Sequence, residues 1–211
     1  MGKVRFAIST SLDGFLAGPE PSPEEPLGRG GMQLHEWAFG LEAWRRPHGL
    51  EGGERNASTS VVEESLANVG AYLMGRTMFG GGTGPWSEPR WNGWWGDDPP
   101  FHVPVFVLTH HTREPLPLKG GTTFTFVTDG IEAALAAARE AAGDRDVVIA
   151  GGASIVQQCL AAGEVDELTV SVAPVFLGGG TRLLDGVPAS LALVQAVEAP
   201  GVVHLKYRVA E

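Results

Sequence analysis

Short apolar strands alternate with helices along most of the chain, and this order restricts the possible fold more than any other feature. Strands are expected at residues 3–9, 71–74, 103–109, 122–128, 146–150, 168–175, 191–198 and 203–209, and helices at 58–69, 131–142 and 154–161. Such alternation is typical of an α/β protein with a mostly parallel sheet. The last two strands flank Pro200 and Gly201 and are expected to form an antiparallel hairpin.

The segments outside these elements are long but do not divide the chain. Irregular stretches at 18–55 and 81–100 are rich in glycine and proline, and one short helix is expected in the first of them, around 34–44. No repeat or linker is evident, so we predict a single domain over residues 1–211 with two long loops.

Charge and cysteine content exclude several classes of protein. The 211 residues hold 25 acidic and 15 basic side chains, a net charge of −10, which argues against a general nucleic-acid or anionic-membrane surface. Cys159 is the only cysteine, so a disulfide framework or a cysteine zinc site cannot form within one chain. No apolar run approaches about 18 residues, and the N-terminus does not resemble a signal peptide. We expect a cytoplasmic protein with no membrane span and no nucleic-acid partner.

At residues 147–156 a buried strand runs directly into two glycines and then a helix. Gly151 and Gly152 leave the backbone N–H groups at the start of this helix open, at the carboxyl edge of the sheet. Such a helix start is a ready site for a phosphate or a pyrophosphate. A tight turn that needs glycine only for its dihedral angles explains the same residues, and the sequence leaves both interpretations open.

Two further strand ends carry residues suited to a phosphate or a nucleotide. Gly75, Arg76 and Thr77 follow one strand, and a guanidinium beside a helix start suits a phosphomonoester, although a surface salt bridge is the alternative. The segment from Thr109 to Arg113 follows the next strand, where open α/β sheets bind ligands. Its two histidines are neighbours without the partner set of a metal motif, so no metal is expected.

All six tryptophans lie in or beside the two irregular stretches. Rings in loops line pockets for flat ligands or form a small core that holds the loops down, and both interpretations stay open. Familiar cofactor and hydrolase motifs are absent, because no G-x-G-x-x-G follows a strand and neither a P-loop nor a G-x-S-x-G elbow occurs.

Five short motifs occur in an order that resembles a known family. They are Ser11-Leu12-Asp13-Gly14, Met74-Gly75-Arg76-Thr77, Val107-Leu108-Thr109, Gly151-Gly152-Ala153-Ser154 and the segment from Ala173 to Gly180. Together they resemble the dihydrofolate reductase superfamily, and more closely its riboflavin-biosynthesis branch, the RibD C-terminal domain and its stand-alone relatives. The resemblance extends from residue 3 to residue 209.

The resemblance implies a dihydrofolate reductase-like three-layer α/β fold, with a mostly parallel central sheet and a C-terminal antiparallel hairpin, that binds NADPH along the carboxyl edges of its strands. It places Gly75, Arg76 and Thr77 on the adenosine-side phosphates, with Arg76 on the 2′-phosphate. The other implied cofactor contacts are Thr109, His110 and Arg113 at the adenosine half, Gly151, Gly152, Ala153, Ser154, Ile155 and Val156 at the pyrophosphate and nicotinamide side, and Ala7, Ile8 and Leu16 at the nicotinamide and its closing loop.

The resemblance also implies a reaction, the transfer of a hydride from NADPH to a C=N or C=O of a small flat heterocycle, as in a 5-amino-6-(5-phosphoribosylamino)uracil reductase. A dihydrofolate or pterin reductase is one alternative, and a protein that binds NADPH without turnover is another. The acid with which dihydrofolate reductases bind the pteridine falls near Thr59 here, which counts against folate. The lysine usual in strand one of the riboflavin reductases falls at Ala7.

Few residues suggest roles in catalysis. Asp13 is the only acid in the matched motifs and is the candidate proton donor, although an aspartate before a glycine also forms turns and water can supply the proton. Trp86 and Trp95 are the candidate substrate contacts, in loops that we expect to close over the substrate as a lid. A homodimer is expected from the resemblance alone.

Overall fold

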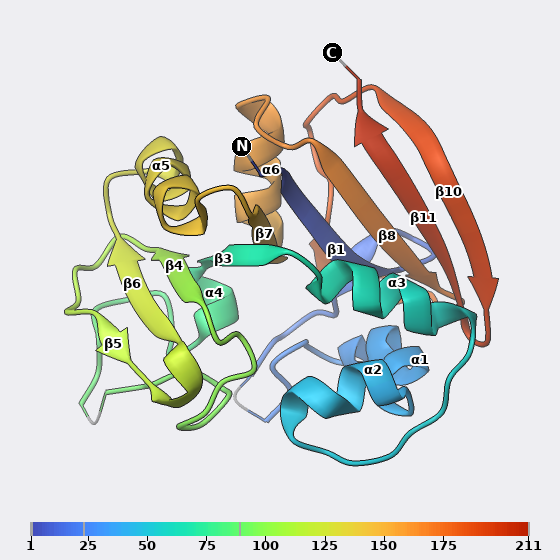
Figure 1. Cartoon of the computed structure of the whole chain (residues 1–211), viewed down its shortest axis with the longest axis horizontal. Coiled ribbons are helices and arrows are strands. Elements are labelled where there is room, and N and C mark those ends of the chain that lie inside the picture. The colour runs from blue at the N-terminus through green and yellow to red at the C-terminus, as the bar shows by residue number, and fades with distance from the viewer. Residues whose placement is uncertain (1, 23, 89, 211) are drawn as a thin grey trace. The chain divides into compact units, whose positions relative to one another are not determined.

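The computed structural model describes residues 2–22, 24–88 and 90–210, which form two compact units (Figure 1). The first unit contains Met1–Arg5 and Asn68–Glu164, and the second contains Phe6–Ala67 and Val165–Glu211. The single domain expected from the sequence stays a prediction.

The first unit is built on a mostly parallel sheet. Its strands lie in the order β7 (Asp146–Gly151), β3 (Val69–Gly75), β4 (Pro104–Leu108), β6 (Thr123–Val127) and β5 (Leu116–Pro117). The strands from β7 to β6 are parallel, and β5 pairs antiparallel with β6. The start of β1 (Val4–Ser11) adds to the other side of β7, where Val4 pairs with Val147 and Arg5 with Val148.

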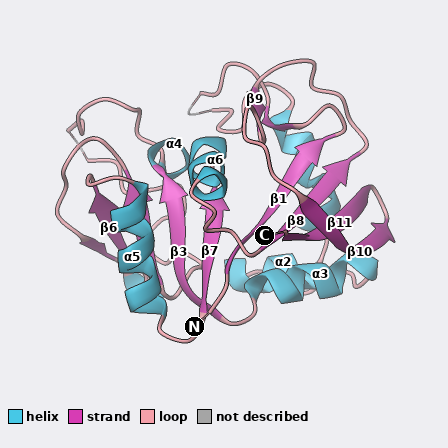
Figure 2. Cartoon of the chain, turned by 90° about the horizontal axis from the view of Figure 1, so that it is seen from above, coloured by secondary structure: helices cyan, strands magenta, loops and turns pink. Residues whose placement is uncertain are grey.

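Within the described residues of the first unit, three α-helices accompany this sheet and a short 3₁₀ helix, η3 (Lys119–Gly121), precedes β6. Figure 2 shows the α-helices beside the strands. The longest, α5 (Ile131–Ala142), contacts β3, β4 and β7 through buried residues that share one helical face: Ala134, Leu135, Ala138 and Ala142. The other two, α4 (Arg76–Phe79) and α6 (Ala153–Ala161), begin where β3 and β7 end. The apolar periodicity of the sequence therefore predicts the positions of α5 and α6 well.

An aromatic cluster fills the space between the sheet and the irregular stretch 81–100. Its buried centre consists of Met74, Phe79, Val105, Val107 and Phe124. Trp86, Trp91 and Trp95 are half-buried against it, and the Trp91 Nε1 donates a hydrogen bond of 2.8 Å to the Phe79 carbonyl. These tryptophans thus hold the loop onto the core, the second of the two roles that the sequence leaves open.

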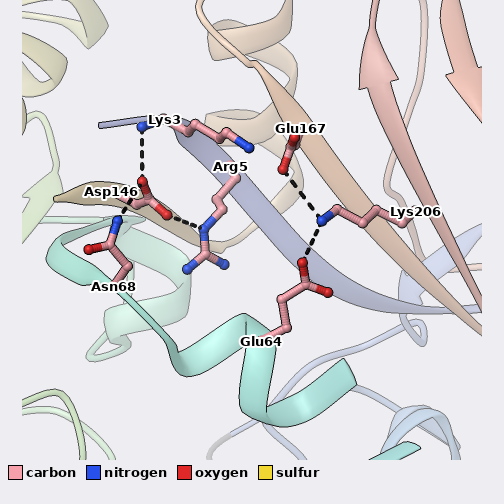
Figure 3. A network of polar contacts seen from close by, with 7 residues as sticks. All are labelled: Lys3, Arg5, Glu64, Asn68, Asp146, Glu167 and Lys206. Atoms are coloured by element: carbon pink, nitrogen blue, oxygen red, sulfur yellow. Dashed lines mark hydrogen bonds and ion pairs between the residues drawn. The ribbon is translucent and has the colours of Figure 1, made fainter. Parts of the chain in front are cut away.

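Asp146 connects the start of β7 to two other segments of the first unit (Figure 3). Its carboxylate accepts hydrogen bonds from the Lys3 backbone N–H (3.0 Å), the Arg5 Nε (2.9 Å) and the Asn68 Nδ2 (3.2 Å). Asp146 is 9% exposed, so water does not compete strongly for these donors.

We expect Asp146→Asn to lower the free energy of unfolding by about 1–2 kcal/mol, because the charge and one acceptor oxygen are lost. Urea unfolding followed by circular dichroism measures this change. Glu140→Ala, on the exposed side of α5, is the control and should change the stability by less than about 0.5 kcal/mol. Equal stability of Asp146→Asn and the wild type would contradict the role given to this carboxylate.

The second unit contains the antiparallel end of the chain. Its strands lie in the order β10 (Leu191–Ala199), β11 (Val202–Val209), β8 (Glu167–Ala173) and β1, with β10 antiparallel to β11 and β11 antiparallel to β8. The turn between Ala199 and Val202 closes the hairpin that Pro200 and Gly201 predict. A short pair, β2 (Phe15–Ala17) with β9 (Thr181–Arg182), lies outside this sheet and was not predicted.

The irregular stretch 18–55 holds more structure than the single helix expected around 34–44. Its described residues, 18–22 and 24–55, include four short helices: η1 (Gly31–His35), α1 (Glu36–Phe39), α2 (Glu42–Arg45) and η2 (Arg46–His48). The expected helix is interrupted after Gly40, because Leu41 adopts an extended conformation with ψ 134°. The apolar periodicity continues across this break and therefore does not reveal it.

The helix expected at 58–69 is α3 (Ala57–Leu66), which begins one residue earlier than predicted. Asn56 is its N-cap: the Asn56 Oδ1 accepts from the Ser58 N–H at 2.8 Å, and the Thr59 Oγ1 accepts from the Asn56 N–H at 2.9 Å. This reciprocal pair of bonds is a capping box.

Candidate cofactor site

The first unit brings three of the predicted binding segments to one edge of its sheet. The strands β7, β3 and β4 are parallel neighbours, with Met74 paired with Gly151 and Gly75 with Leu108. Their carboxyl ends therefore lie together, and α4 and α6 start at this edge (Figure 2). Open α/β sheets bind ligands at such an edge.

The start of α6 is open on its N-terminal side. Gly152 is the N-cap residue and supplies no side-chain cap, and its carbonyl accepts from the N–H groups of Ile155 (3.2 Å) and Val156 (3.3 Å). The N–H groups of Ala153 and Ser154 precede the first intrahelical bond and so have no acceptor within the helix. A Cβ on Gly152 would meet no atom within 4 Å, so a ligand has room to approach.

Glycine is required on both sides of this opening. Gly151 has φ 140°, a conformation that residues with a side chain rarely adopt. A Cβ on Gly75 would lie 3.0 Å from the Ile155 Cγ1, so glycine lets the start of α4 approach α6. Gly151 thus allows the backbone conformation of the turn, and Gly75 allows the close approach of α4 and α6.

Two arginines of the first unit share one tryptophan ring. The guanidinium carbon of Arg76 lies 3.5 Å from the centroid of the Trp86 ring, and that of Arg113 lies 4.8 Å from it. Arg76 is 7% exposed, donates to the carbonyls of Gly80 and Gly81, and leaves its Nε without a partner. Sequence patterns do not predict these carbonyl contacts, although the glycine run after α4 is a signal for a tight loop.

The two side chains on this ring are both positively charged, and the carboxylate of Glu88 acts on Arg113 from a distance. Arg113 donates to the Trp91 carbonyl (2.5 Å) and the Asn92 Oδ1 (2.8 Å). Burial lowers the pKa of Arg76, and the charge of Arg113 lowers it further; burial and the charge of Arg90 lower the pKa of Arg113, and the charge of Glu88 raises it. Neither Arg76 nor Arg113 forms a salt bridge with a carboxylate in the part of the chain that the structure describes. The pair is suited to an anion, and most of all to a phosphate.

The end of β4 lies beside the same ring. Thr109 is buried and its Oγ1 accepts from the His111 N–H at 3.2 Å, while His110 and Thr77 are exposed. The Trp86 Nε1 donates to the His111 carbonyl at 3.1 Å. Trp86 therefore connects the segment after β4 to Arg76.

Trp95 lies in the aromatic cluster, stacked on Phe124 with a centroid distance of 6.1 Å and edge-on to Phe101 at 4.9 Å. The roles of Trp86 and Trp95 as substrate contacts, and of the loops as a lid, stay predictions.

The remaining predicted residues belong to the second unit. Ala7 is exposed, and Ile8 and Leu16 are half-buried. The Asp13 carboxylate accepts from the backbone N–H groups of Leu177 (3.1 Å) and Gly178 (2.8 Å). A hydrogen bond from Ser11, followed by these two backbone bonds, lowers the pKa of Asp13 despite some desolvation, so at neutral pH it is an acceptor.

The second unit offers no free carboxylate at the position expected for a pteridine. The Thr59 hydroxyl caps α3. Glu63 pairs with Arg55 at 3.1 Å, and Glu64 pairs at 2.5 Å with Lys206, which also approaches Glu167 at 3.6 Å (Figure 3). These contacts agree with the sequence argument against folate.

Over residues 2–22, 24–88 and 90–210, no three histidine, cysteine, aspartate or glutamate side chains are grouped as they would be around a metal ion. Within the same ranges, every helix is too short or too polar to cross a membrane.

The fold and the glycine-rich edge define a class of protein, the α/β proteins with a dihydrofolate reductase-like fold. The model of the RibD C-terminal domain matches residues 2–205, and the chain belongs to this family. A search of curated proteins finds no match.

Solved structures of low sequence identity share the fold. A protein from Shewanella sp. PV-4 assigned to riboflavin biosynthesis aligns with a TM-score of 0.64 and 19% identity over 99% of both chains. RibD from Acinetobacter baumannii aligns with a TM-score of 0.58 and 16% identity over 100% of this chain and 59% of RibD. The riboflavin biosynthesis reductase Rib7 of Saccharomyces cerevisiae aligns with a TM-score of 0.53 and 16% identity, over 100% of this chain and 89% of Rib7.

The chain spans less than two thirds of some of these relatives. Besides the A. baumannii protein, it covers 57% of a Thermotoga maritima protein described as a diaminohydroxyphosphoribosylaminopyrimidine deaminase and 5-amino-6-(5-phosphoribosylamino)uracil reductase.

Proposed function

We propose that the protein is an NADPH-dependent reductase that transfers a hydride to a C=N or C=O of a small heterocycle, of the 5-amino-6-(5-phosphoribosylamino)uracil reductase type. The observation that supports this proposal is the meeting of segments 75–77, 109–113 and 151–156 at one sheet edge of a RibD C-terminal domain protein. The T. maritima relative carries this activity in its description.

The residues at this edge fit a phosphorylated dinucleotide. The N–H groups of Ala153 and Ser154, which have no acceptor within α6, suit a pyrophosphate, and the open space at Gly152 admits it. Arg76 and Arg113, two arginines without a carboxylate salt bridge among the described residues, suit the 2′-phosphate that distinguishes NADPH from NADH. The proposal also includes contacts of Thr77 with the adenosine-side phosphates and of Thr109 and His110 with the adenosine half of the cofactor.

When bound, the nicotinamide supplies the hydride. The chain's own residues bind and orient the nucleotide: the arginines of the first unit hold its phosphate. Contacts of Ala7, Ile8 and Leu16 with the nicotinamide and its closing loop stay a prediction. Because its partners keep Asp13 ionised, we assign the proton to water.

Turnover with two substrates tests this proposal. We expect the protein to oxidise NADPH in the presence of 5-amino-6-(5-phosphoribosylamino)uracil, and not with dihydrofolate, because Thr59, Glu63 and Glu64 are engaged. Loss of NADPH absorbance and chromatography of the product measure the reaction. Reduction of dihydrofolate alone would contradict the proposal. NADPH binding without turnover of either substrate would favour a protein that binds NADPH without catalysis. The presence of Ala7 at the position of the strand-one lysine supports this second candidate.

The proposal includes a homodimer, as the resemblance implies. Sedimentation equilibrium should give twice the mass of the 22.2 kDa chain, and a monomer at micromolar concentration would contradict it.

A further inference from the structure

Strand β11 of the second unit alternates between apolar and polar side chains. Val203, Leu205 and Tyr207 point to one face of its sheet, and His204 and Lys206 point to the other. When one face of an antiparallel sheet is in water, the apolar side chains normally face the core. The arrangement in this sheet is the opposite, because His204 is 2% exposed whereas Val203 is 40% exposed.

The polar face is the face that α3 covers. The Ser58 hydroxyl of α3 contacts the His204 Nε2 at 2.8 Å, and Glu64 of the same helix pairs with Lys206 at 2.5 Å (Figure 3). Figure 2 shows α3 along one side of β8, β11 and β10. The helix therefore covers the polar side of these strands, and their apolar side needs another cover.

The apolar side of β8, β11 and β10, which we call the open face, is continuous over all three strands. Its six residues are paired directly across the strands: Leu193 with Tyr207, Leu205 with Val170, and Val203 with Val172. Paired side chains on one face lie about 4.5–5.5 Å apart, so the six form one patch. None of the six is buried, and Leu193 is 59% exposed. A contiguous apolar patch in water is typical of an interaction site.

The distribution of charge favours a second copy of this chain as the partner. The net charge is −10, so two copies repel each other over most of their surfaces. The register puts Glu167, Lys206 and Arg208 on the face that α3 covers. On the open face, the charged residue of these strands is Glu198, which lies at the end of β10. Two copies can therefore meet at the centre of this face without opposing charges.

The shape of the open face also matches a second sheet. Two sheets pack face to face about 10 Å apart through side chains of this kind. From the spacing of strands and residues, the patch covers roughly 14 by 20 Å. This size suits the apolar centre of a standard interface, which buries about 800 Å² on each partner and has a polar rim.

The free edge of β10 is less suited to a partner than the face. A bulge between Leu193 and Gln195 interrupts the regular register of this strand. Bulges at a sheet edge disfavour the addition of another strand. Contact through the face is therefore expected, and not extension of the sheet at its edge.

We propose that the open face packs on the same face of a second copy of this chain and is the interface of the homodimer. The contact is isologous, so a two-fold axis brings the apolar side chains of one copy onto those of the other. The inference rests on the homodimer that the proposed function includes and adds the surface to it. It does not depend on the reaction.

Leu193→Asp tests the open face by sedimentation equilibrium of the full chain. We expect the mass to fall from twice 22.2 kDa to that of one chain at micromolar concentration, a rise of at least about 100-fold in the Kd of the dimer, because the symmetric contact would bury two unpaired carboxylates. Leu193→Lys should act in the same way, which separates the loss of apolar contact from the added negative charge. Because Leu193 is exposed in the single chain, both variants should keep the circular dichroism spectrum of the wild type.

Ala192→Asp is the matched control. Ala192 is an exposed residue of the same strand, and its pairing with Arg208 puts it on the face opposite to Leu193. The variant should therefore remain a dimer. Val203→Asp introduces the same charge on β11, within the open face, and should dissociate the dimer as Leu193→Asp does.

The outcomes separate this inference from the proposed function. A monomeric wild type would leave the open face to a different protein, and it would overturn the inference together with the proposed homodimer. A dimeric wild type whose Leu193→Asp and Val203→Asp variants stay dimeric, or whose Ala192→Asp variant dissociates as well, overturns the inference alone. Because the measurement uses no substrate, a failure of the proposed reaction does not change its result.

Discussion

Arg76→Ala is expected to weaken NADPH binding by about 1.5–3 kcal/mol, roughly a 10- to 150-fold rise in Kd, and to leave NADH binding nearly unchanged. The buried Arg76 guanidinium lies beside a second cation, Arg113, and forms no salt bridge with a carboxylate in the described ranges. A 2′-phosphate would neutralise both charges, whereas NADH has no group to place there. Titration of each nucleotide with the purified variant measures the two losses.

Arg76 also supports the fold, and its test must separate the two roles. The side chain donates to Gly80 and Gly81 and stacks on Trp86, so its removal also loosens the loop after α4. NADH binding by the same variant is the internal control for this effect. Lys119→Ala is the control, because Lys119 is an exposed cation of the same unit that pairs with Asp97 at 3.8 Å and is not placed at the proposed site. Equal losses for NADPH and NADH would contradict the placement of the 2′-phosphate.

The second large expected effect is a dependence of stability on pH that arises from His204. This histidine of the second unit is fully buried, with 2% of its surface exposed. Its Nε2 contacts the Ser58 Oγ and its Nδ1 the Ser171 Oγ, both at 2.8 Å, and the Trp37 ring lies edge-on at a centroid distance of 4.8 Å. One hydroxyl accepts from the ring and the other donates to it, so the neutral imidazole is satisfied. Burial lowers the pKa of His204 from 6.5 to about 4.

This shift predicts a loss of stability in mild acid. Below pH 6.5 the unfolded chain binds a proton at His204 that the folded protein does not bind until about pH 4. The stabilisation is therefore complete above pH 6.5 and is lost as the pH falls from 6.5 to about 4, by about 3 kcal/mol in all. Urea unfolding at several pH values measures it.

His204→Gln provides the comparison, because it removes the titrating ring while the carboxylates that also titrate in this range remain. The difference in stability between wild type and variant should shrink as the pH falls from 6.5 to about 4. Titration of the His204 ring protons by NMR reports the same pKa directly in the wild type. A difference that stays constant over this range, with a His204 pKa near 6.5, would contradict the prediction.

The regular elements that form the cofactor edge could be predicted from sequence, and the side-chain arrangement could not. Buried strands such as β7 and β3 appear as short apolar runs, and the glycines that follow them mark where each strand ends. The strands β2, β5 and β9 have two or three residues each, too few to show a period. Their pairing depends on distant partners and not on local pattern.

Arg76 shows the limit of motif reasoning most clearly. The M-G-R-T motif places its backbone at the start of α4, but the direction of the guanidinium depends on Trp86 and on the carbonyls of Gly80 and Gly81. Asp13 shows the same limit in the second unit, because its two acceptor contacts lie 164 and 165 residues away in sequence. Contacts of this separation leave no local signal.

Titration of the wild-type protein with NADPH and with NADH, followed by tryptophan fluorescence, is the most direct test of the proposed cofactor site. The Trp86 ring contacts both Arg76 and Arg113 and is therefore placed to report on a phosphate bound by them. We expect saturable quenching by NADPH, with an affinity for NADH at least about tenfold lower. Equal affinities, or no binding of either nucleotide, would contradict the assignment of this edge to NADPH.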